Sequence, residues 1–152
     1  MIYIKELSKH IGQTVELKGW VANKRSSGKL AFIEMRDGSG YVQCIAELQT
    51  LGEEKFAIAK KLTRESSLSI TGTVVENERQ LGGVELQVSD LNVYQLTPDY
   101  PIAKKAHGVD FLMNNRHLWL RSRKQWAVMR VRNRLQYAIH QFFQERGFAQ
   151  LD

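Results

Sequence analysis

Hydrophobic and polar residues alternate along five short segments of the chain, and a period of two is typical of β-strands with one buried face. We predict strands over residues 14–21, 31–36, 41–46, 67–76 and 84–93. In each strand the apolar side chains share one side, which we expect to face a core. The strand residues predicted to face this core are Val15, Leu17, Val21, Ala31, Ile33, Met35, Val42, Cys44, Leu68, Ile70, Val74, Val84, Leu86 and Val88.

Apolar residues spaced by three or four predict two helices among these strands. A short helix is expected over residues 4–11 and a longer one over residues 53–65, which has acidic residues in its first turn. The apolar residues on the inner sides of these helices are Ile4, Leu7, Ile11, Phe56, Ala59 and Leu62.

The order of the elements predicts a mainly β fold. Turns are expected over residues 37–40, which read Asp-Gly-Ser-Gly, and over residues 77–83. Three strands, a helix and two strands is the order of the OB-fold, a five-stranded Greek-key barrel that leaves no open sheet edge. The same order also fits another small α+β domain, but the helix between the third and fourth strands favours the OB-fold.

Beyond the last strand the pattern changes to a linker and a long amphipathic helix. The linker contains both prolines of the chain, and the helix of roughly 24 residues over 123–146 spans ~36 Å. We expect Gly147 to end this helix and a strand to begin after it. Because the apolar side of the helix has no partner in the sequence, we expect a truncated protein. The apolar side consists of Val128, Val131, Leu135, Ala138 and Phe142. The expected domains are a barrel over 1–97, a linker or hinge over 98–122 and the start of a second domain over 123–152.

The composition is that of an ordinary globular protein, with 43% hydrophobic and 25% charged residues. No stretch approaches the ~18 consecutive apolar residues of a membrane span, and the first ten residues lack the apolar core of a secretion signal. Cys44 is the only cysteine and the four histidines lack metal-ligand spacing, so we expect neither a disulfide nor a metal site. These features predict a cytoplasmic protein with no membrane partner.

The net charge of +6 is unevenly distributed along the chain. Residues 1–110 contain 14 basic and 14 acidic residues, whereas residues 111–152 contain 8 basic and 2 acidic ones. Residues 111–144 include no acidic residue at all. Such a basic run fits a solvated surface, a docking surface for an acidic domain or, as the sharper interpretation, a nucleic-acid contact.

The predicted strand over 31–36 carries an aromatic residue on its polar side. Phe32 shares that side with Glu34 and Arg36 because successive side chains alternate. The turn expected before this strand carries three basic residues, Lys24, Arg25 and Lys29. An outward ring beside basic residues suits stacking on an unpaired base and binding of its phosphates. The alternative is a single exposed phenylalanine in an ordinary strand.

Three further sequence features occur in order along the chain. They are GWVANKRSSGK followed by FIEMRDGSGYVQ, then HGVDFLMNNRHLWLRSRKQ, then FFQERGF. Together they resemble the N-terminal part of the bacterial-type asparaginyl-tRNA synthetases, a family of class II enzymes, and the resemblance covers all 152 residues. The aspartyl relatives share GWV, F-I-x-M-R-D and V-Q. They differ in carrying further arginines and Asp-Leu-Gly in the turn, and they lack the RHLWLRS form.

The resemblance implies that the barrel binds the anticodon loop of tRNA-Asn. Phe32 matches a strand-two aromatic that stacks on the central U of the anticodon, and Gln43 matches a strand-three glutamine that recognises a base edge. Arg25 matches a first-turn arginine that contacts the loop, and Glu85 in VELQV is the nearest match to a glutamate that contributes to recognition. From the strand period alone, Gln43 fits a solvated position and Glu85 fits a cross-strand charge partner. We expect Trp20, Trp119 and Trp126 to be packing residues.

The resemblance also implies that the long helix opens class II motif 1, which builds the homodimer interface of the full-length enzyme. That enzyme activates asparagine with ATP and magnesium and then acylates tRNA. These 152 residues contain no ATP-binding motif and no Gly-rich phosphate loop, so we expect no cofactor, no catalytic residue and no activity in this chain alone. Two alternatives stay open, a freestanding single-strand-binding OB protein and a fragment of an aspartyl or dual-specificity synthetase.

Overall fold

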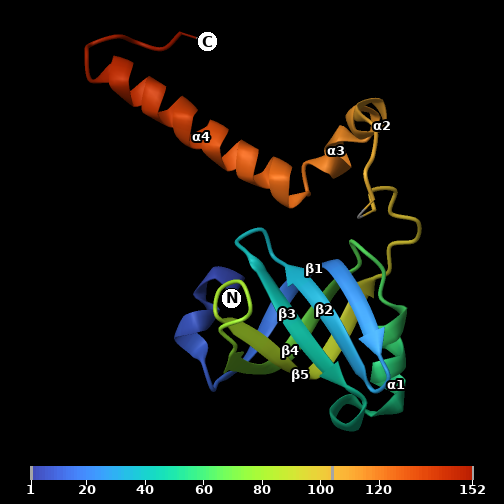
Figure 1. The fold of residues 1–152 in the computed structure, drawn as a ribbon. Coiled ribbons are helices and arrows are strands. Elements are labelled where there is room, and N and C mark those ends of the chain that lie inside the picture. The colour runs from blue at the N-terminus through green and yellow to red at the C-terminus, as the bar shows by residue number, and fades with distance from the viewer. Residues whose placement is uncertain (1, 104, 152) are drawn as a thin grey trace. The chain divides into compact units, whose positions relative to one another are not determined.

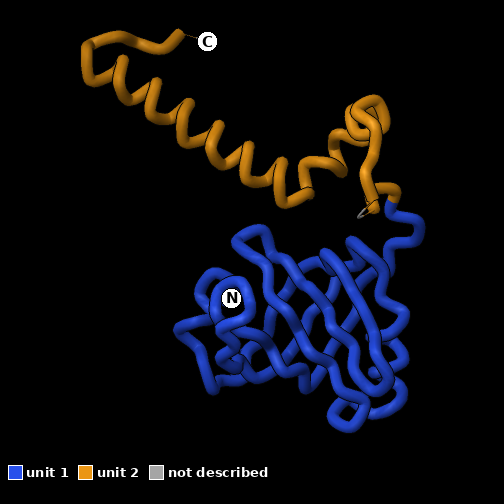
Figure 2. Tube along the Cα trace, viewed as in Figure 1, with its two compact units in different colours: residues 1–100 blue, residues 101–152 orange. Residues whose placement is uncertain are grey.

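The computed structural model describes residues 2–103 and 105–151, so Met1, Lys104 and Asp152 lie outside the described residues. The chain divides into two compact units, residues 1–100 and residues 101–152 (Figure 2). The strands of the described chain all belong to the first unit, and its second unit contains helices alone.

The first unit is a closed β-barrel with the strand order β1-β2-β3-β5-β4 (Figure 1). The strands are β1 (Thr14–Ser27), β2 (Leu30–Arg36), β3 (Tyr41–Glu47), β4 (Ser67–Glu76) and β5 (Val84–Gln95). β3 and β5 pair in parallel, and the other neighbouring pairs are antiparallel. The helix α1 (Leu48–Lys61) connects β3 to β4 and packs against β2, β3 and β5. The predicted mainly β fold, an OB-fold barrel with this helix between its third and fourth strands, is confirmed.

The barrel interior is filled by the apolar side of each strand. Each strand position predicted to face the core is buried, and Val21, Ile33 and Leu86 have no exposed surface. The inner side of α1 is buried as predicted. The predicted N-terminal helix is a 3-10 helix, η1 (Ile4–His10), which buries Ile4 and Leu7. Ile11, which falls at the same helical spacing, is exposed because the chain leaves the helix at this residue.

β1 is longer than the sequence pattern predicts. The pairing with β2 continues to the pair Ser27 and Leu30, so the hairpin turn consists of Gly28 and Lys29. Gly28 has a φ of +56°, a conformation that glycine adopts at little cost and that a tight hairpin requires. Arg25 therefore lies on a strand, whereas the sequence predicts a turn.

α1 begins and ends earlier than the predicted helix over 53–65. Its first turn, from Leu48, is separated from the rest by Gly52, whose φ of 74° and ψ of 166° interrupt the helix. Because of this interruption, the first turn does not continue the helical period of the residues that follow. The helix ends at Lys61 because the next residue, Leu62, has a ψ of 136°, outside the helical region. Beyond it, Glu65 adopts a φ of +64°. There the Glu65 N–H donates a hydrogen bond of 2.7 Å to the carbonyl of Val21.

The second unit contains α2 (Val109–Asn114), α3 (Arg116–Trp119) and α4 (Arg123–Gln144). α4 is the predicted long helix, and Gly147 follows it with a φ of +81° while the Phe148 N–H closes onto the Phe143 carbonyl. The short helices α2 and α3 lie in the segment predicted as a linker, and no strand forms over residues 148–151 of the described chain. Neither short helix shows a sequence period, because each has too few residues to repeat one.

No residue of α4 is buried within the part of the chain that the structure describes. The apolar side predicted for this helix is therefore exposed, including Val131 and Leu135. None of the helices in the described residues has both the length and the apolar character that a membrane span needs.

Candidate nucleic-acid interface

A β-bulge in β1 decides which side chains share the outer side of the barrel with Phe32. The pairing with β2 passes from Val21 opposite Met35 to Asn23 opposite Glu34, which leaves Ala22 without a pair. A strict period of two from buried Val21 would turn Arg25 toward the core. The extra residue shifts the alternation by one, so Arg25 lies outward and directly opposite Phe32.

Arg25 and Phe32 form a cation–π pair on this outer surface. The guanidinium carbon of Arg25 lies 4.4 Å from the centroid of the Phe32 ring, and the ring is only half-buried. Ala31 and Ile33, on either side of Phe32 in β2, have no exposed surface, so the barrel core fixes the strand that carries the ring. A base that stacks on this face of the ring displaces the exposed guanidinium, which then lies beside the ring as a cation for the adjacent phosphate.

Polar groups lie on the same outer side two residues along from Phe32, which itself pairs with Ile45 of β3. Gln43 of β3 pairs with Glu34 of β2 on one side and with Glu85 of β5 on the other. The Gln43 Nε2 donates to Glu85 Oε2 over 3.4 Å, and the Asn77 Nδ2 donates to the same oxygen over 2.9 Å. A side-chain amide and a carboxylate held in this way can donate to and accept from a base edge.

Glu85 lies off the core side, as the alternation predicts, but only 9% of it is exposed. The alternation predicts its side of the strand but not this degree of burial. The two amides that donate to Oε2 offset part of the cost of covering this carboxylate.

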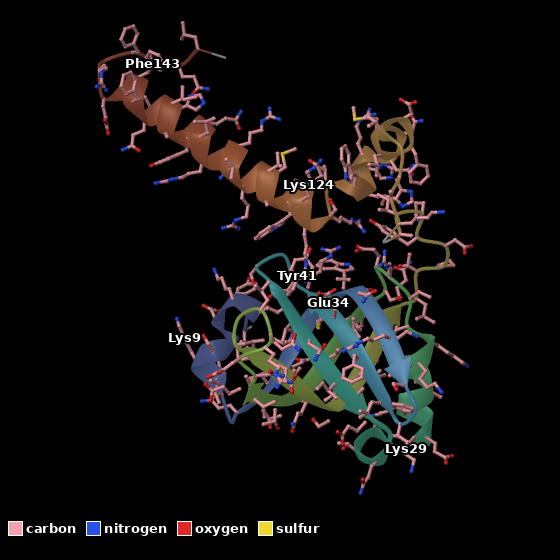
Figure 3. All side chains as sticks on the ribbon, in the orientation of Figure 1. Lys9, Lys29, Glu34, Tyr41, Lys124 and Phe143 are labelled. Carbon is pink, nitrogen blue, oxygen red and sulfur yellow. The ribbon has the colours of Figure 1, made fainter. Side chains whose placement is uncertain are left out.

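The structure does not bring two of the predicted basic residues to Phe32. Lys24 lies opposite Ile33, and its Nζ donates to the carbonyl of Lys60 in the last turn of α1, where the helix dipole favours a cation. Lys29 occupies the exposed hairpin turn, and its carbonyl accepts from the Leu48 N–H at 3.0 Å. Figure 3 shows Lys29 at the end of the barrel next to α1, away from Glu34 and Tyr41.

Asn77 is the residue of this cluster that sequence analysis misses. It sits in the turn between β4 and β5, where asparagine is common for conformational reasons alone. Its N–H donates to the Gly83 carbonyl at 2.9 Å and its Oδ1 accepts from the Arg79 N–H at 3.1 Å. The antiparallel pairing of β4 and β5 places this turn beside Glu85, and the parallel pairing of β3 and β5, which no local pattern reports, adds Gln43.

The described residues hold no group of three or more His, Cys, Asp or Glu side chains that could bind a metal ion. Cys44 lies in the core, and burial raises the pKa of its thiol to about 12. The thiol is therefore protonated at neutral pH and is a poor nucleophile.

The arrangement of Phe32 and Arg25 with the Gln43–Glu85 pair is suited to binding an unpaired nucleic-acid strand.

Comparison with known proteins agrees with this geometry. The model of the tRNA anticodon family, an OB-fold nucleic acid binding domain, matches residues 15–94. An asparagine–tRNA ligase of Symbiobacterium thermophilum is 49% identical over 147 residues, which cover 97% of this chain and 34% of the relative. The resemblance to asparaginyl-tRNA synthetases is thereby confirmed, and the chain spans about a third of the length of that relative.

Two solved structures extend the comparison. The asparaginyl-tRNA synthetase from Pyrococcus horikoshii complexed with asparaginyl-adenylate has a TM-score of 0.91 and 34% identity, covering 99% of this chain and 36% of that one. The aspartyl tRNA synthetase from Entamoeba histolytica has a TM-score of 0.79 and 19% identity, covering 99% and 38%, and shares the fold. Since the matched family model spans more than half of the sequence, the chain belongs to the tRNA anticodon family of OB-fold nucleic acid binding domains.

Proposed function

We propose that this chain binds the anticodon loop of tRNA-Asn as part of an asparagine–tRNA ligase. The observation that carries the proposal is the Phe32 ring, half-exposed on the outer side of β2, with the Arg25 guanidinium over it and the Gln43–Glu85 pair beside it. The 49% identity to an asparagine–tRNA ligase, which also extends through the second unit, favours this function over a freestanding single-strand-binding protein.

Each side chain of the interface has a distinct role in this proposal. Phe32 stacks on an anticodon base, and Arg25 binds a phosphate without regard to sequence. Gln43 and Glu85 recognise base edges through hydrogen bonds. Lys29 contributes long-range attraction from the hairpin turn. Lys24 has no contact with RNA, because its ammonium group is bonded to α1.

The whole enzyme would activate asparagine with ATP and magnesium, acylate tRNA and work as a cytoplasmic homodimer. The exposed apolar side of α4 supports the dimer, because an apolar surface of this length is typical of an interface. Asparaginyl-adenylate in the Pyrococcus horikoshii structure supports the use of ATP by the whole enzyme. This chain by itself is expected to form no adenylate.

The test is calorimetric binding of anticodon stem–loops at fixed salt, with a Phe32→Ala variant. Base–aromatic stacking contributes ~1–3 kcal/mol, so the variant is expected to bind a GUU loop about 5- to 150-fold more weakly. The matched control is Tyr137→Ala, since Tyr137 also pairs with an arginine, Arg134 at 5.4 Å, but lies on α4. Equal binding by wild type and Phe32→Ala would contradict the proposal.

The same assay separates asparaginyl from aspartyl specificity. A GUC loop differs from a GUU loop at the last anticodon base alone, so it retains the base that stacks on Phe32. Tighter binding of the GUU loop supports the asparaginyl assignment, and equal binding of the two loops supports dual specificity.

A further inference from the structure

A second group of aromatic side chains surrounds a cavity at another part of the barrel surface. The cavity has a volume of about 300 Å³, and its lining includes Tyr3, Lys18, Trp20 and Tyr94. The three rings are 44%, 41% and 55% exposed for Tyr3, Trp20 and Tyr94. Trp20, which we expect to be a packing residue, is thus partly exposed, and an open cavity with aromatic walls needs another explanation.

Trp20 lies on the same side of the sheet as Phe32. It pairs with Arg36 of β2, and Arg36, Glu34 and Phe32 alternate along the outer side of that strand. Arg36 is four positions from Phe32 along β2, which corresponds to about 13 Å at 3.3 Å per residue. The bulge at Ala22 keeps both Trp20 and Arg25 outward, although a strict alternation would turn residues five positions apart to opposite sides.

The Trp20 ring packs against the side chain of Arg36. The guanidinium carbon of Arg36 lies 5.3 Å from the ring centroid, and Arg36 forms an ion pair of 2.5 Å with Glu65. Both members of this ion pair are largely buried, so the cation cannot move away from the ring. A preorganised ring binds a stacked partner at a lower cost in conformational entropy than a free side chain does.

The charges at the cavity favour an anionic ligand. Lys18 is half-exposed, and its ion pair with the half-exposed Glu16 is long, at 4.0 Å, so solvent screens it. Asp37 also lines the cavity, but its Oδ2 accepts from the Ile4 N–H at 2.7 Å and its Oδ1 from the Ser39 N–H at 2.8 Å. The carboxylate is thus engaged by the protein, and the cation at the rim is the charge available to a ligand.

We propose that this cavity is a second nucleotide subsite, which takes an unpaired base of the same RNA strand that stacks on Phe32. The base stacks on Trp20 beside Tyr94, and its phosphate lies near Lys18. The inference rests on the proposed function and extends it. Continuity with the Phe32 site supports it, because OB-folds bind about 4–16 nucleotides and the two rings lie on one side of one strand.

The test compares two RNA ligands on the full chain: a GUU trinucleotide, which covers the Phe32 site alone, and the whole anticodon stem–loop. Trp20→Ala is expected to weaken stem–loop binding about 5- to 150-fold and to leave trinucleotide binding unchanged. Trp20→Phe keeps a stacking ring and is expected to retain most of the affinity. Tyr94→Ala, a change at an exposed position, is expected to weaken the stem–loop alone.

A spectroscopic measurement reports on the same subsite. Trp20, Trp119 and Trp126 are the three tryptophans of the chain, so Trp119→Phe with Trp126→Phe leaves Trp20 as the only tryptophan emitter. Its fluorescence is expected to be quenched by the stem–loop and not by the trinucleotide. Stem–loop affinity unchanged in Trp20→Ala and Tyr94→Ala would overturn the proposal. So would equal weakening of both RNAs.

Two further outcomes are distinguishable. If Phe32→Ala weakens the stem–loop but Trp20→Ala does not, the second subsite is wrong and the proposed function stands. If neither change has an effect, both are wrong. If Trp20→Ala alters sedimentation of the protein and not RNA binding, the cavity takes a second copy of the chain, and the proposal is overturned.

Discussion

The barrel and the helix α4 both place arginines over aromatic rings, yet they differ in how the backbone that carries each ring is packed. On the barrel, Arg25 lies over Phe32 and Arg36 over Trp20, on strands whose other side is buried. On α4 the corresponding pairs are Arg130 with Trp126 and Arg134 with Tyr137, on a helix with no buried residue in the described chain. The ring of each pair is therefore held by a packed core in the barrel and by its own helix alone in α4.

The distribution of charge makes the comparison sharper. Residues 111–152 supply the whole net charge of +6, whereas the first 110 residues are balanced. The convergent group of aromatic, amide and carboxylate side chains nevertheless lies on the balanced part. Excess charge attracts nucleic acid from a distance, but a rigid arrangement of hydrogen-bonding and stacking groups is what recognises a sequence.

Separating the two units is the change with the largest expected effect. A protein that ends at Tyr100 keeps the whole barrel core, so we expect it to fold and to bind the GUU stem–loop with a Phe32-dependent affinity. Residues 101–152 alone are expected to lose most of their helix on dilution, because isolated helices are marginal in water. Circular dichroism and calorimetry measure the two results. If the isolated barrel folds but Phe32→Ala no longer weakens its binding of the stem–loop, the comparison fails.

Matched truncations of apolar side chains test the difference in packing. Ile33→Ala in the barrel core is expected to lower the free energy of unfolding by about 2–5 kcal/mol, because it leaves a cavity. Leu135→Ala on exposed α4 is expected to change it by less than about 0.5 kcal/mol and to reduce self-association instead. Urea denaturation and sedimentation at several protein concentrations distinguish the two. Equal destabilisation would mean that α4 packs within a single chain.

The barrel could be predicted from sequence because burial imposes a period of two on every strand. Val15, Leu17 and Val21 show that period and are buried as predicted. The bulge that follows them could not be predicted, because Ala22 suits either side of a strand and nothing local marks an extra residue. Without the bulge, the alternation turns Arg25 inward and Lys24 outward, the reverse of what the structure shows. Resemblance to the synthetases, and not the period, identified Arg25.

Contacts between distant segments were the part of the site that sequence patterns could not supply. Asn77 and Glu65 each lie in a turn. Glu65 bonds to Arg36, 29 residues away. Asn77 joins the Gln43–Glu85 pair, whose members lie 42 residues apart. Neither partner is marked by spacing or by charge pattern. Phe32 and Gln43 could be placed on the outer side because their strands alternate cleanly, although only the resemblance suggested a role for Gln43.

The adjacent residues Arg25 and Lys24 test whether the fixed cation, and not basic charge in general, binds phosphate. A hydrogen bond to a charged group contributes about 1.5–3 kcal/mol, so Arg25→Ala is expected to weaken every loop about 10- to 150-fold. It should also reduce the slope of log affinity against log salt by about 0.7. Lys24→Ala and Arg134→Ala, which remove one charge each from other surfaces, should leave binding nearly unchanged. The measurement is a titration at several salt concentrations, and equal effects of all three changes would assign binding to net charge.

The smallest expected effect concerns Asn77, which acts on RNA through Glu85 and not by contact. Removing its amide deprives Glu85 Oε2 of the shorter of its two hydrogen bonds, while the Phe32 ring is untouched. A lost hydrogen bond costs about 0.5–1.5 kcal/mol, so Asn77→Ala is expected to reduce the preference for GUU over loops with one substituted base about 2- to 13-fold.

The matched control for Asn77 is Glu78→Ala, a change in the same turn at an exposed residue, which should leave the preference intact. A double change separates positioning from direct contact. If Asn77 works by orienting Glu85, then Asn77→Ala should add little to the loss of preference already caused by Glu85→Gln. Losses that add fully in calorimetry would show that Asn77 contacts the RNA independently. The turn between β4 and β5 would then be part of the binding surface, whereas its hydrogen bonds in the structure indicate that it orients Glu85.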